Sequence, residues 1–113
     1  MTFEDVRQIA LTFPGSEEYI HFGRPALRVG KHFLACIAKI DQDTLVLKVP
    51  DPLEREMRLA TNPDMYYLTD HYASFDALLI RLPNADREEV KHLIEQAWRH
   101  FASKKLLAAY SKR

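Results

Sequence analysis

The sequence predicts an α+β fold, a two-layer sandwich in which an antiparallel sheet carries its helices on one side. Three observations lead to this class. A helical stripe of apolar residues opens the chain, a series of strand-like segments follows without a helix between them, and a long amphipathic helix comes near the end. The expected order is α-β(3)-α-β(2)-α, with three or more strands in the first group. The 113 residues fit one domain over residues 1–113.

The first helix is expected close to the N-terminus. Thr2 is a suitable N-cap, and Asp5 places a carboxylate near the positive end of the helix. Pro14-Gly15 then ends the helix. Its apolar side chains recur at helical spacing and predict one buried stripe: Phe3, Val6, Ile9, Ala10 and Phe13.

A meander of short strands is expected next. Gly30-Lys31 and Asp41-Gln42-Asp43 have the composition of tight turns. No helical pattern interrupts this stretch, so its strands are expected to pair antiparallel. The segments with strand composition are residues 18–22, 26–29, 32–40 and 44–49.

A second helix is expected over residues 53–60. Asp51 can cap it, and Glu54 and Arg58 stand at the i,i+4 spacing that favours an ion pair on one helix face. After Asn62-Pro63-Asp64, which ends this helix, strands are expected at residues 65–69 and 75–82.

The last long helix has the clearest pattern. Asp86 can cap it, Glu88 and Glu89 lie in its first turn, and Arg99 lies near its end, so its charges match the helix dipole. Residues 106–110 are expected to add one more short helical turn. The apolar stripe consists of Val90, Leu93, Ile94, Ala97, Trp98 and Phe101.

The charge balance argues against tight non-specific DNA binding by a monomer. The chain carries 16 basic and 16 acidic side chains, so its formal net charge is zero. A DNA-binding protein usually has a basic excess, because much of its affinity comes from neutralising phosphates. A local basic patch is still compatible with this composition.

We expect a cytoplasmic protein. Cys36 is the single cysteine, which rules out an intrachain disulfide and suits a reducing compartment. The first residues are acidic and lack the pattern of a signal peptide. No apolar run approaches the roughly 18 residues that a membrane span needs, so no membrane partner is expected.

No pattern in the sequence indicates an enzyme, a metal or a cofactor. The five histidines show no close metal-ligand spacing, and the three glycines form no phosphate-binding loop. Cys36 lies within a predicted strand and is interpreted as a small buried thiol. The aromatic residues Tyr66, Tyr67, Tyr72 and Phe75 favour a core role over a pocket lining. A deep pocket joining Tyr66, His71 or Cys36 to a charged group would instead favour catalysis.

Several short motifs occur in order along nearly the whole chain: Pro14-Gly15-Ser16-Glu17-Glu18, His21-Phe22-Gly23-Arg24-Pro25, Leu27-Arg28-Val29-Gly30-Lys31 with Phe33, Leu45-Val46-Leu47-Lys48-Val49, and Ala97-Trp98-Arg99 with Lys104-Lys105-Leu106. This ordered set resembles the MmcQ/YjbR family of bacterial proteins. One departure is Asp70-His71-Tyr72-Ala73, where many relatives carry a Gly-Trp pair. The resemblance implies a fold akin to secretion-chaperone-like domains and a "double wing" role in DNA binding, in which hairpin tips approach the nucleic acid.

The predicted DNA contacts lie on and beside the first basic hairpin, whose turn is flanked by Arg28, Lys31 and His32. A two-stranded ribbon fits a major groove, where basic side chains reach phosphates or guanine edges. Asp41 and Asp43 at the next turn would repel phosphate and are interpreted as turn residues. The candidate DNA-binding residues are Arg24, Arg28, Lys31, His32, Lys39 and Lys48.

Two alternatives to DNA contact stay open. First, lysine and arginine are equally typical of exposed strands and sheet edges, where they keep the protein soluble and prevent aggregation. The sheet face is also a candidate surface for a protein partner or a small ligand, with the chain a monomer or weak homodimer. The basic C-terminal residues favour a solvated tail over an arm that supplements a DNA surface. These residues are Arg99, Lys104, Lys105, Lys112 and Arg113.

Overall fold

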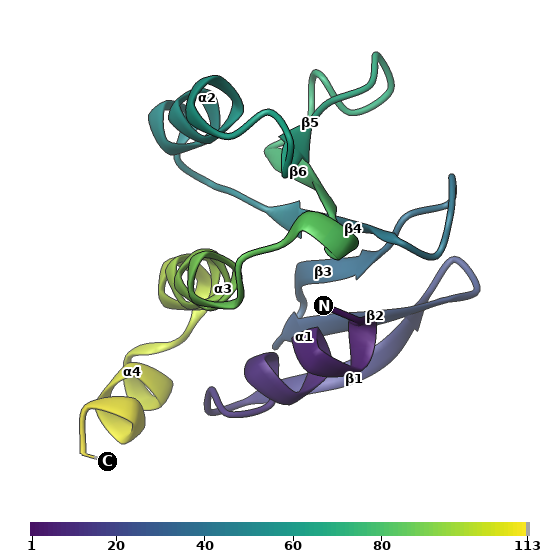
Figure 1. Ribbon diagram of the computed structural model, residues 1–113. Helices are drawn as coiled ribbons and strands as arrows, with labels where there is room; N and C mark the ends of the chain where they lie inside the picture. The colour runs from purple at the N-terminus through teal and green to yellow at the C-terminus, as the bar shows by residue number, and fades with distance from the viewer. Residues whose placement is uncertain (113) are drawn as a thin grey trace.

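The computed structural model describes residues 1–112 and contains helices and strands in the predicted order (Figure 1). Arg113, the last residue of the predicted basic tail, lies outside the described residues. The helices are α1 (Phe3–Ala10), α2 (Pro52–Thr61), α3 (Arg87–Phe101) and α4 (Lys104–Ser111), with a short 3-10 turn at Leu82–Asn84. The strands are β1 (Ser16–His21), β2 (Arg24–Val29), β3 (His32–Ile37), β4 (Thr44–Lys48), β5 (Tyr66–Tyr67) and β6 (Ala77–Arg81).

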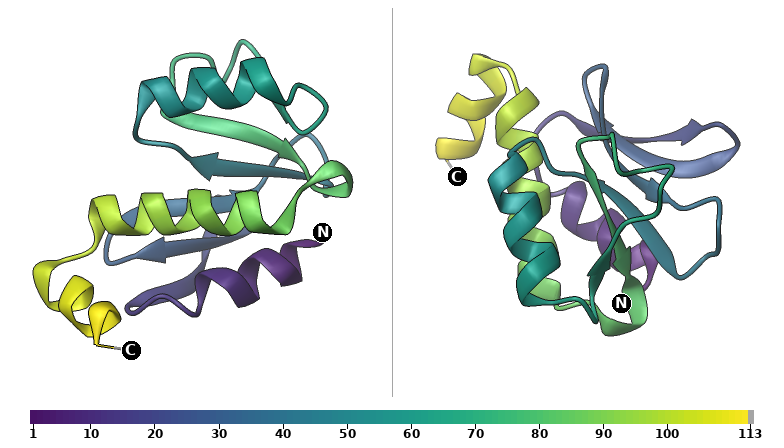
Figure 2. Two further views of the ribbon diagram at one scale, coloured as in Figure 1. Left: turned by 60° about the vertical axis from the view of Figure 1, so that its left-hand side comes forward. Right: turned by 90° about the horizontal axis from the view of Figure 1, so that it is seen from above.

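The predicted α+β class is confirmed by the sheet. Within residues 1–112, six strands pair antiparallel in the order β1-β2-β3-β4-β6-β5. Four strands precede α2, in keeping with the expected three or more. Helices α1, α2 and α3 lie over one face of this sheet, and α3 crosses the middle of the layer (Figure 2). Within residues 1–112, no helix lies over the opposite face.

The helix starts follow the caps that the sequence predicts. Thr2 and Asp5 form a capping box at α1, and the side chains of Asp51 and Asp86 accept backbone hydrogen bonds at the starts of α2 and α3. Ser103 caps α4 in the same way, so the expected single turn is an eight-residue helix. The helices in the described part of the chain all lack the length and apolar composition of a membrane span.

The main core lies between the helices and the sheet. Trp98 of α3 is fully buried, and its indole Nε1 donates a hydrogen bond of 2.8 Å to the carbonyl oxygen of Pro14. The Phe13 ring stacks on the Trp98 ring with 5.5 Å between centroids. Alternate residues of the central strands complete this core, including Leu45, Leu47 and Leu78. The contact with Pro14 thus fixes the end of α1 against α3.

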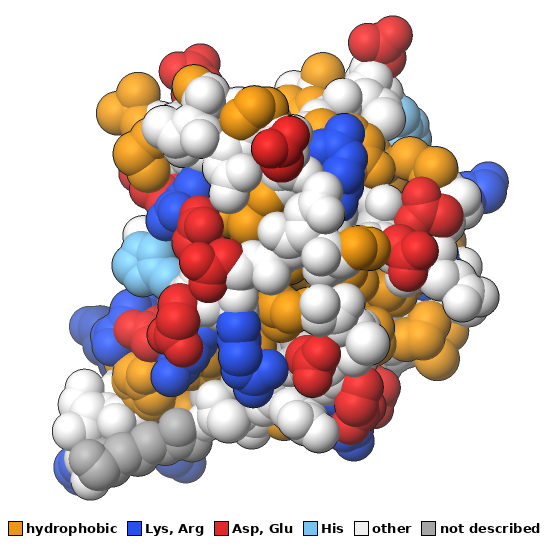
Figure 3. Space-filling model, in the orientation of Figure 1, with side chains coloured by type: hydrophobic (Ala, Val, Ile, Leu, Met, Phe, Trp, Pro, Cys, Tyr) orange, Lys and Arg blue, Asp and Glu red, His pale blue; other side chains and the backbone are white. Residues whose placement is uncertain are grey.

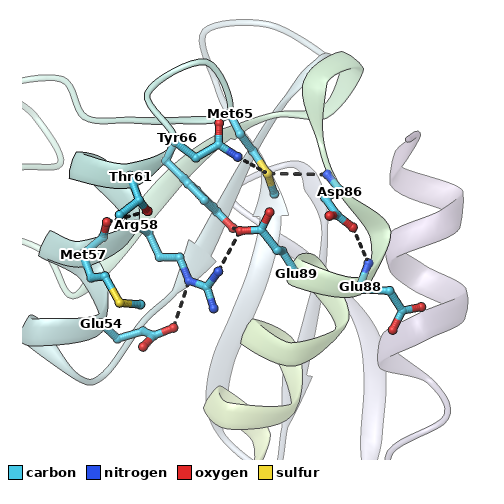
Figure 4. A network of polar contacts seen from close by, with 10 residues as sticks. Glu54, Met57, Arg58, Thr61, Met65, Tyr66, Asp86, Glu88 and Glu89 are labelled. Atoms are coloured by element: carbon cyan, nitrogen blue, oxygen red, sulfur yellow. Dashed lines mark hydrogen bonds and ion pairs between the residues drawn. The ribbon is translucent and has the colours of Figure 1, made fainter.

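A polar network joins three elements at the other end of the core (Figure 4). The Arg58 guanidinium of α2 lies 2.9 Å from Glu54 and 2.7 Å from Glu89 of α3. The Tyr66 hydroxyl of β5 donates to the same Glu89 oxygen at 3.1 Å. The predicted Glu54–Arg58 pair is therefore present, and Glu89 extends it to a second helix. Burial, together with the Glu89 charge, raises the pKa of Tyr66 far above its usual range, so its hydroxyl remains a donor.

Candidate functional site

The face of the sheet without helices, here called the open face, contains its own small apolar cluster. Buried Ala26, Cys36, Val46 and Leu79 form its centre. Tyr19, Phe33, Tyr67 and Tyr72 pack against that centre and are only partly buried. Because side chains alternate along a strand, Arg24, Arg28 and Lys48 also belong to this face.

The six predicted DNA-contact residues do not form one patch. Arg24, Arg28 and Lys48 belong to the open face, whereas exposed Lys31 lies in the β2–β3 turn at one end of the sheet. The His32 ring stacks on Phe101 of α3 at 4.5 Å, which places it on the helix side. The sequence could not separate these positions, because strand register decides which face a side chain occupies.

Arg28 already has an anionic partner. Its Nε donates to the Glu17 carboxylate at 2.7 Å, and its guanidinium lies 4.5 Å from the centroid of the Tyr19 ring. Glu17 and Arg28 are direct neighbours in the β1–β2 pairing. The Arg28 guanidinium is therefore held and partly neutralised by Glu17 of β1. It is less available to a phosphate than its position on the open face suggests.

Five of the six residues make no ion pair within residues 1–112: Arg24, Lys31, His32, Lys39 and Lys48. Arg24 stands out among them. Its Nη1 atom is buried yet has no hydrogen-bond partner among the described residues. A buried donor of this kind favours a ligand that can accept from it.

Two turns project from the same end of the sheet, opposite the β2–β3 turn (Figure 1). The β1–β2 turn has Phe22 and Gly23 at its centre, both with positive φ (50° and 78°), as a type I′ turn requires. The connection from β3 to β4 holds Lys39, Ile40 and Asp41. A groove of about 930 Å³ lies between the two turns, with Arg24 and Lys39 among its lining residues.

The tips of both turns expose apolar side chains. Phe22 is 87% exposed and Ile40 is 58% exposed. Phenylalanine at positive φ is uncommon and costs conformational energy, so this tip is an unusual place for an aromatic residue. Neither Phe22 nor Ile40 is among the six predicted DNA-contact residues. The Phe22-Gly23 pair, with a glycine suited to the second turn position, was the available signal.

The acidic residues of the second turn have the structural role that the sequence predicts for them. The Asp41 carboxylate accepts a hydrogen bond of 2.8 Å from the Asp43 backbone amide, which closes a local turn. Both residues are exposed. They add negative charge close to Lys39 and reduce the positive potential of this tip. The surface in Figure 3 likewise mixes acidic and basic side chains without a field of one sign.

Cys36 lies on the open face in a setting that does not activate it. Its side chain is buried, and burial raises the pKa of the thiol, an effect that the nearby Arg24 charge only partly offsets. A nucleophilic cysteine needs a lowered pKa and access to substrate. Cys36 is therefore the buried thiol that the sequence predicts.

The comparisons with known proteins agree with one another. The family model described as YjbR matches residues 11–100. The uncharacterized proteins Rv2570 of Mycobacterium tuberculosis and Mb2600 of Mycobacterium bovis are each 26% identical over 125 residues, which cover 96% of this chain and 95% of theirs.

A solved structure shares the fold. The crystal structure of the Deinococcus radiodurans protein DR2400, which contains a DUF419 domain, is similar with a TM-score of 0.75 and 20% sequence identity. The similarity covers 92% of this chain and 80% of that chain. Together with the family match over most of the chain, the arrangement of helices and sheet leads to one conclusion: the chain belongs to the YjbR family.

Proposed function

We propose that this protein is a non-enzymatic DNA-binding protein that contacts duplex DNA with its two projecting turns. One observation carries the proposal. Each turn presents an exposed apolar side chain beside a basic residue that makes no ion pair within residues 1–112: Phe22 with Arg24, and Ile40 with Lys39. This observation supports a contact at the end of the sheet opposite the β2–β3 turn, whereas the sequence predicts it at that turn.

Apolar tips offer a way to bind DNA without a strongly basic surface. Proteins that insert phenylalanine or isoleucine wedges between base steps partly unstack the duplex and gain contact area from its bending. Arginine and lysine beside the wedge then contact the phosphates or the groove. This mode fits a chain of zero net charge, because fewer phosphate contacts have to supply the affinity.

The proposal includes a non-catalytic role and a cytoplasmic location. A cavity on the open face does bring Cys36 and His71 beside Arg24 and Lys48, but the raised pKa of the Cys36 thiol argues against its use as a nucleophile. A buried reduced thiol supports the cytoplasmic location that the sequence predicts, since reducing compartments preserve free cysteines.

The direct test is fluorescence anisotropy with a labelled duplex of about 20 base pairs at several salt concentrations. Phe22→Asn removes the aromatic wedge and replaces it with a residue that tolerates positive φ, so the turn should survive. We expect this change to weaken binding about tenfold, since a wedge contributes on the order of 1–3 kcal/mol through stacking. Lys39→Gln should weaken binding about threefold and reduce the salt slope by about one.

Matched controls are available on the helix side. Leu53 of α2 is 75% exposed and apolar, and Lys91 of α3 is exposed and makes no ion pair within residues 1–112. Leu53→Asn and Lys91→Gln should leave the affinity unchanged. Undetectable binding of the wild type at low salt, or equal losses in the controls and the turn variants, would rule out this mode of DNA contact.

A further inference from the structure

A second cavity lies on the open face and shares Phe22 and Arg24 with the groove between the turns. Its volume is about 390 Å³, and its floor includes Phe33, Cys36 and Val46 of the two central strands β3 and β4. One wall comes from the segment 71–76, which precedes β6 and lies far from β3 in sequence. This volume falls within the range of sites for small organic ligands.

The wall segment is held in place by α2. The Arg55 Nη2 atom donates to the backbone carbonyl oxygens of Tyr72 at 3.3 Å and Ala73 at 2.9 Å. Backbone hydrogen bonds within the segment, from Tyr72 to Thr69 and from Phe75 to Tyr72, close its turns. The wall is therefore preorganised, which lowers the entropy cost of binding a ligand beside it.

The polar groups of the cavity favour an anion. Arg24 and Lys48 both line it and make no ion pair within residues 1–112. The buried Nη1 atom of Arg24 has no hydrogen-bond partner among those residues. One carboxylate, that of exposed Asp76, also lines the cavity. Two basic side chains thus line the cavity with one carboxylate, whereas the whole chain has a formal net charge of zero.

Aromatic rings form the remaining surface. The His21 and Phe33 rings lie 5.1 Å apart on the strand side, and His71 and Phe75 lie 5.6 Å apart on the wall side. Phe75 is 51% exposed and lines this cavity, so the core role that the sequence predicts for it is wrong. Aromatic side chains prefer offset or edge contacts with a flat ligand between or beside them. A ligand with a planar apolar group fits this lining best.

We propose that the open-face cavity binds a small organic acid that joins a carboxylate to a planar aromatic group. The carboxylate accepts from the free Arg24 guanidinium, with Lys48 as a second cation, because arginine matches a carboxylate with two parallel hydrogen bonds. The ring lies against Phe33 and Phe75. The site shares Phe22 and Arg24 with the proposed DNA surface but extends beyond it, since Lys48 and Phe33 lie on central strands away from both turn tips.

The test uses 2-naphthoate as the probe and its neutral analogue 2-naphthamide as the matched comparison. Binding is followed by NMR on protein with labelled methyl groups, where Val46 and Ala77 report from the cavity. We expect saturable 1:1 binding of 2-naphthoate, and at least about tenfold weaker binding of the amide, because a charge-assisted pair contributes more than a neutral one. Inorganic phosphate alone should bind more weakly than 2-naphthoate, because it lacks the ring.

Substitutions distinguish binding in the cavity from a general effect of protein charge. Arg24→Gln should weaken 2-naphthoate binding about tenfold and Lys48→Gln about threefold. Lys31→Gln removes the same charge at the β2–β3 turn and should change nothing. Thermal unfolding of each variant checks that the fold is retained.

Three results would overturn the proposal: equal binding of the acid and the amide, phosphate binding as tight as that of 2-naphthoate, or unchanged binding in Arg24→Gln. Absence of 2-naphthoate binding at millimolar concentration would do so as well. Lys39→Gln changes a turn tip but not this cavity, and Lys48→Gln changes the cavity but neither turn tip, so a loss of DNA binding is distinguishable from a loss of the acid site.

Discussion

The Arg28 Nε atom lies 2.7 Å from the Glu17 carboxylate across the first two strands, and the two residues are direct partners in the β1–β2 register. Both side chains remain partly exposed, at 38% for Arg28 and 55% for Glu17. The ion pair is therefore worth little to stability, but it places a negative charge where an approaching phosphate would otherwise meet only a cation. The acidic partner limits the basic character of the open face.

Removing that acidic partner should strengthen DNA binding. Glu17→Gln frees Arg28 and changes the net charge by one unit. We expect the affinity for duplex DNA to rise about threefold and the salt slope to increase by about one, because one more cation becomes available to a phosphate. Anisotropy titrations over a series of salt concentrations measure both quantities.

Glu18→Gln is the matched control for this change. Glu18 pairs with Arg7 of α1 at 3.0 Å, so its removal makes the same change in net charge but frees a cation on another element. Its effect on the affinity should be smaller. Equal gains from the two substitutions would show that overall charge, rather than Arg28, decides the binding.

Arg58 should be the most sensitive charged residue for stability. Its side chain is 16% exposed and bridges Glu54 and Glu89. Arg58→Leu leaves two partly buried carboxylates facing each other without a counter-ion, and we expect it to lower the free energy of unfolding by about 1–3 kcal/mol. Urea unfolding followed by Trp98 fluorescence measures this loss. Arg87→Leu, which removes an exposed pair with Asp5 at 3.9 Å, should leave the midpoint nearly unchanged. Similar losses in both variants would contradict the bridging role.

Gly15 should not tolerate a side chain. Its φ is +76°, and a Cβ atom there would lie 2.7 Å from Leu106 Cδ1 of α4. Gly15→Ala should destabilise the protein by about 1–3 kcal/mol through backbone strain and displacement of this leucine. Gly23→Ala has the same strain at φ +78° but no neighbour within 4 Å, so it should cost less. A double-mutant cycle with Leu106→Ala measures the contact alone, and a coupling near zero would refute it.

The Cys36 thiol should react slowly in the folded protein. Burial raises its pKa, so the reactive thiolate is scarcer at neutral pH than in an exposed cysteine and increases only as the pH rises towards that raised value. We expect the rate of reaction with a disulfide reagent at neutral pH to be about a hundredfold below that of the unfolded chain, because access requires local opening. Stopped-flow labelling with and without urea gives the ratio. If the native protein reacted as fast as the unfolded chain, Cys36 would instead be an accessible, reactive thiol.

The helix ends and the order of elements could be predicted because their signals are local. Thr2, Asp51 and Asp86 cap the predicted helices, and the stripe ending in Trp98 packs as its spacing indicates. Strand ends were less accurate. The strand expected over 32–40 stops at Ile37, since only one backbone hydrogen bond, from Ala38 to Thr44, continues the ladder before the turn.

The candidate site was predicted only in part. The basic residues were chosen as DNA-contact candidates by residue type, and the structure divides them among the open face, the β2–β3 turn and the helix side. A register shift between Leu27 and Arg28 contributes to this division, because it changes how β2 pairs with β3 at that point. The ion pair of Arg28 with Glu17 also depends on strand pairing. Neither follows from the spacing of residues along the chain.

The sequence by itself determined that this protein is an α+β domain with capped helices, an antiparallel meander and a buried Cys36, since turn residues, caps and apolar periodicity act over a few neighbouring positions. Only the tertiary structure decided that Phe22 and Ile40 project from the same end of the sheet. It also brought Arg24 and Lys48 together with the segment 71–76 around one cavity. The reason is physical: pairing across the sheet joins residues far apart in sequence, and a shift of one residue would turn each side chain to the other face.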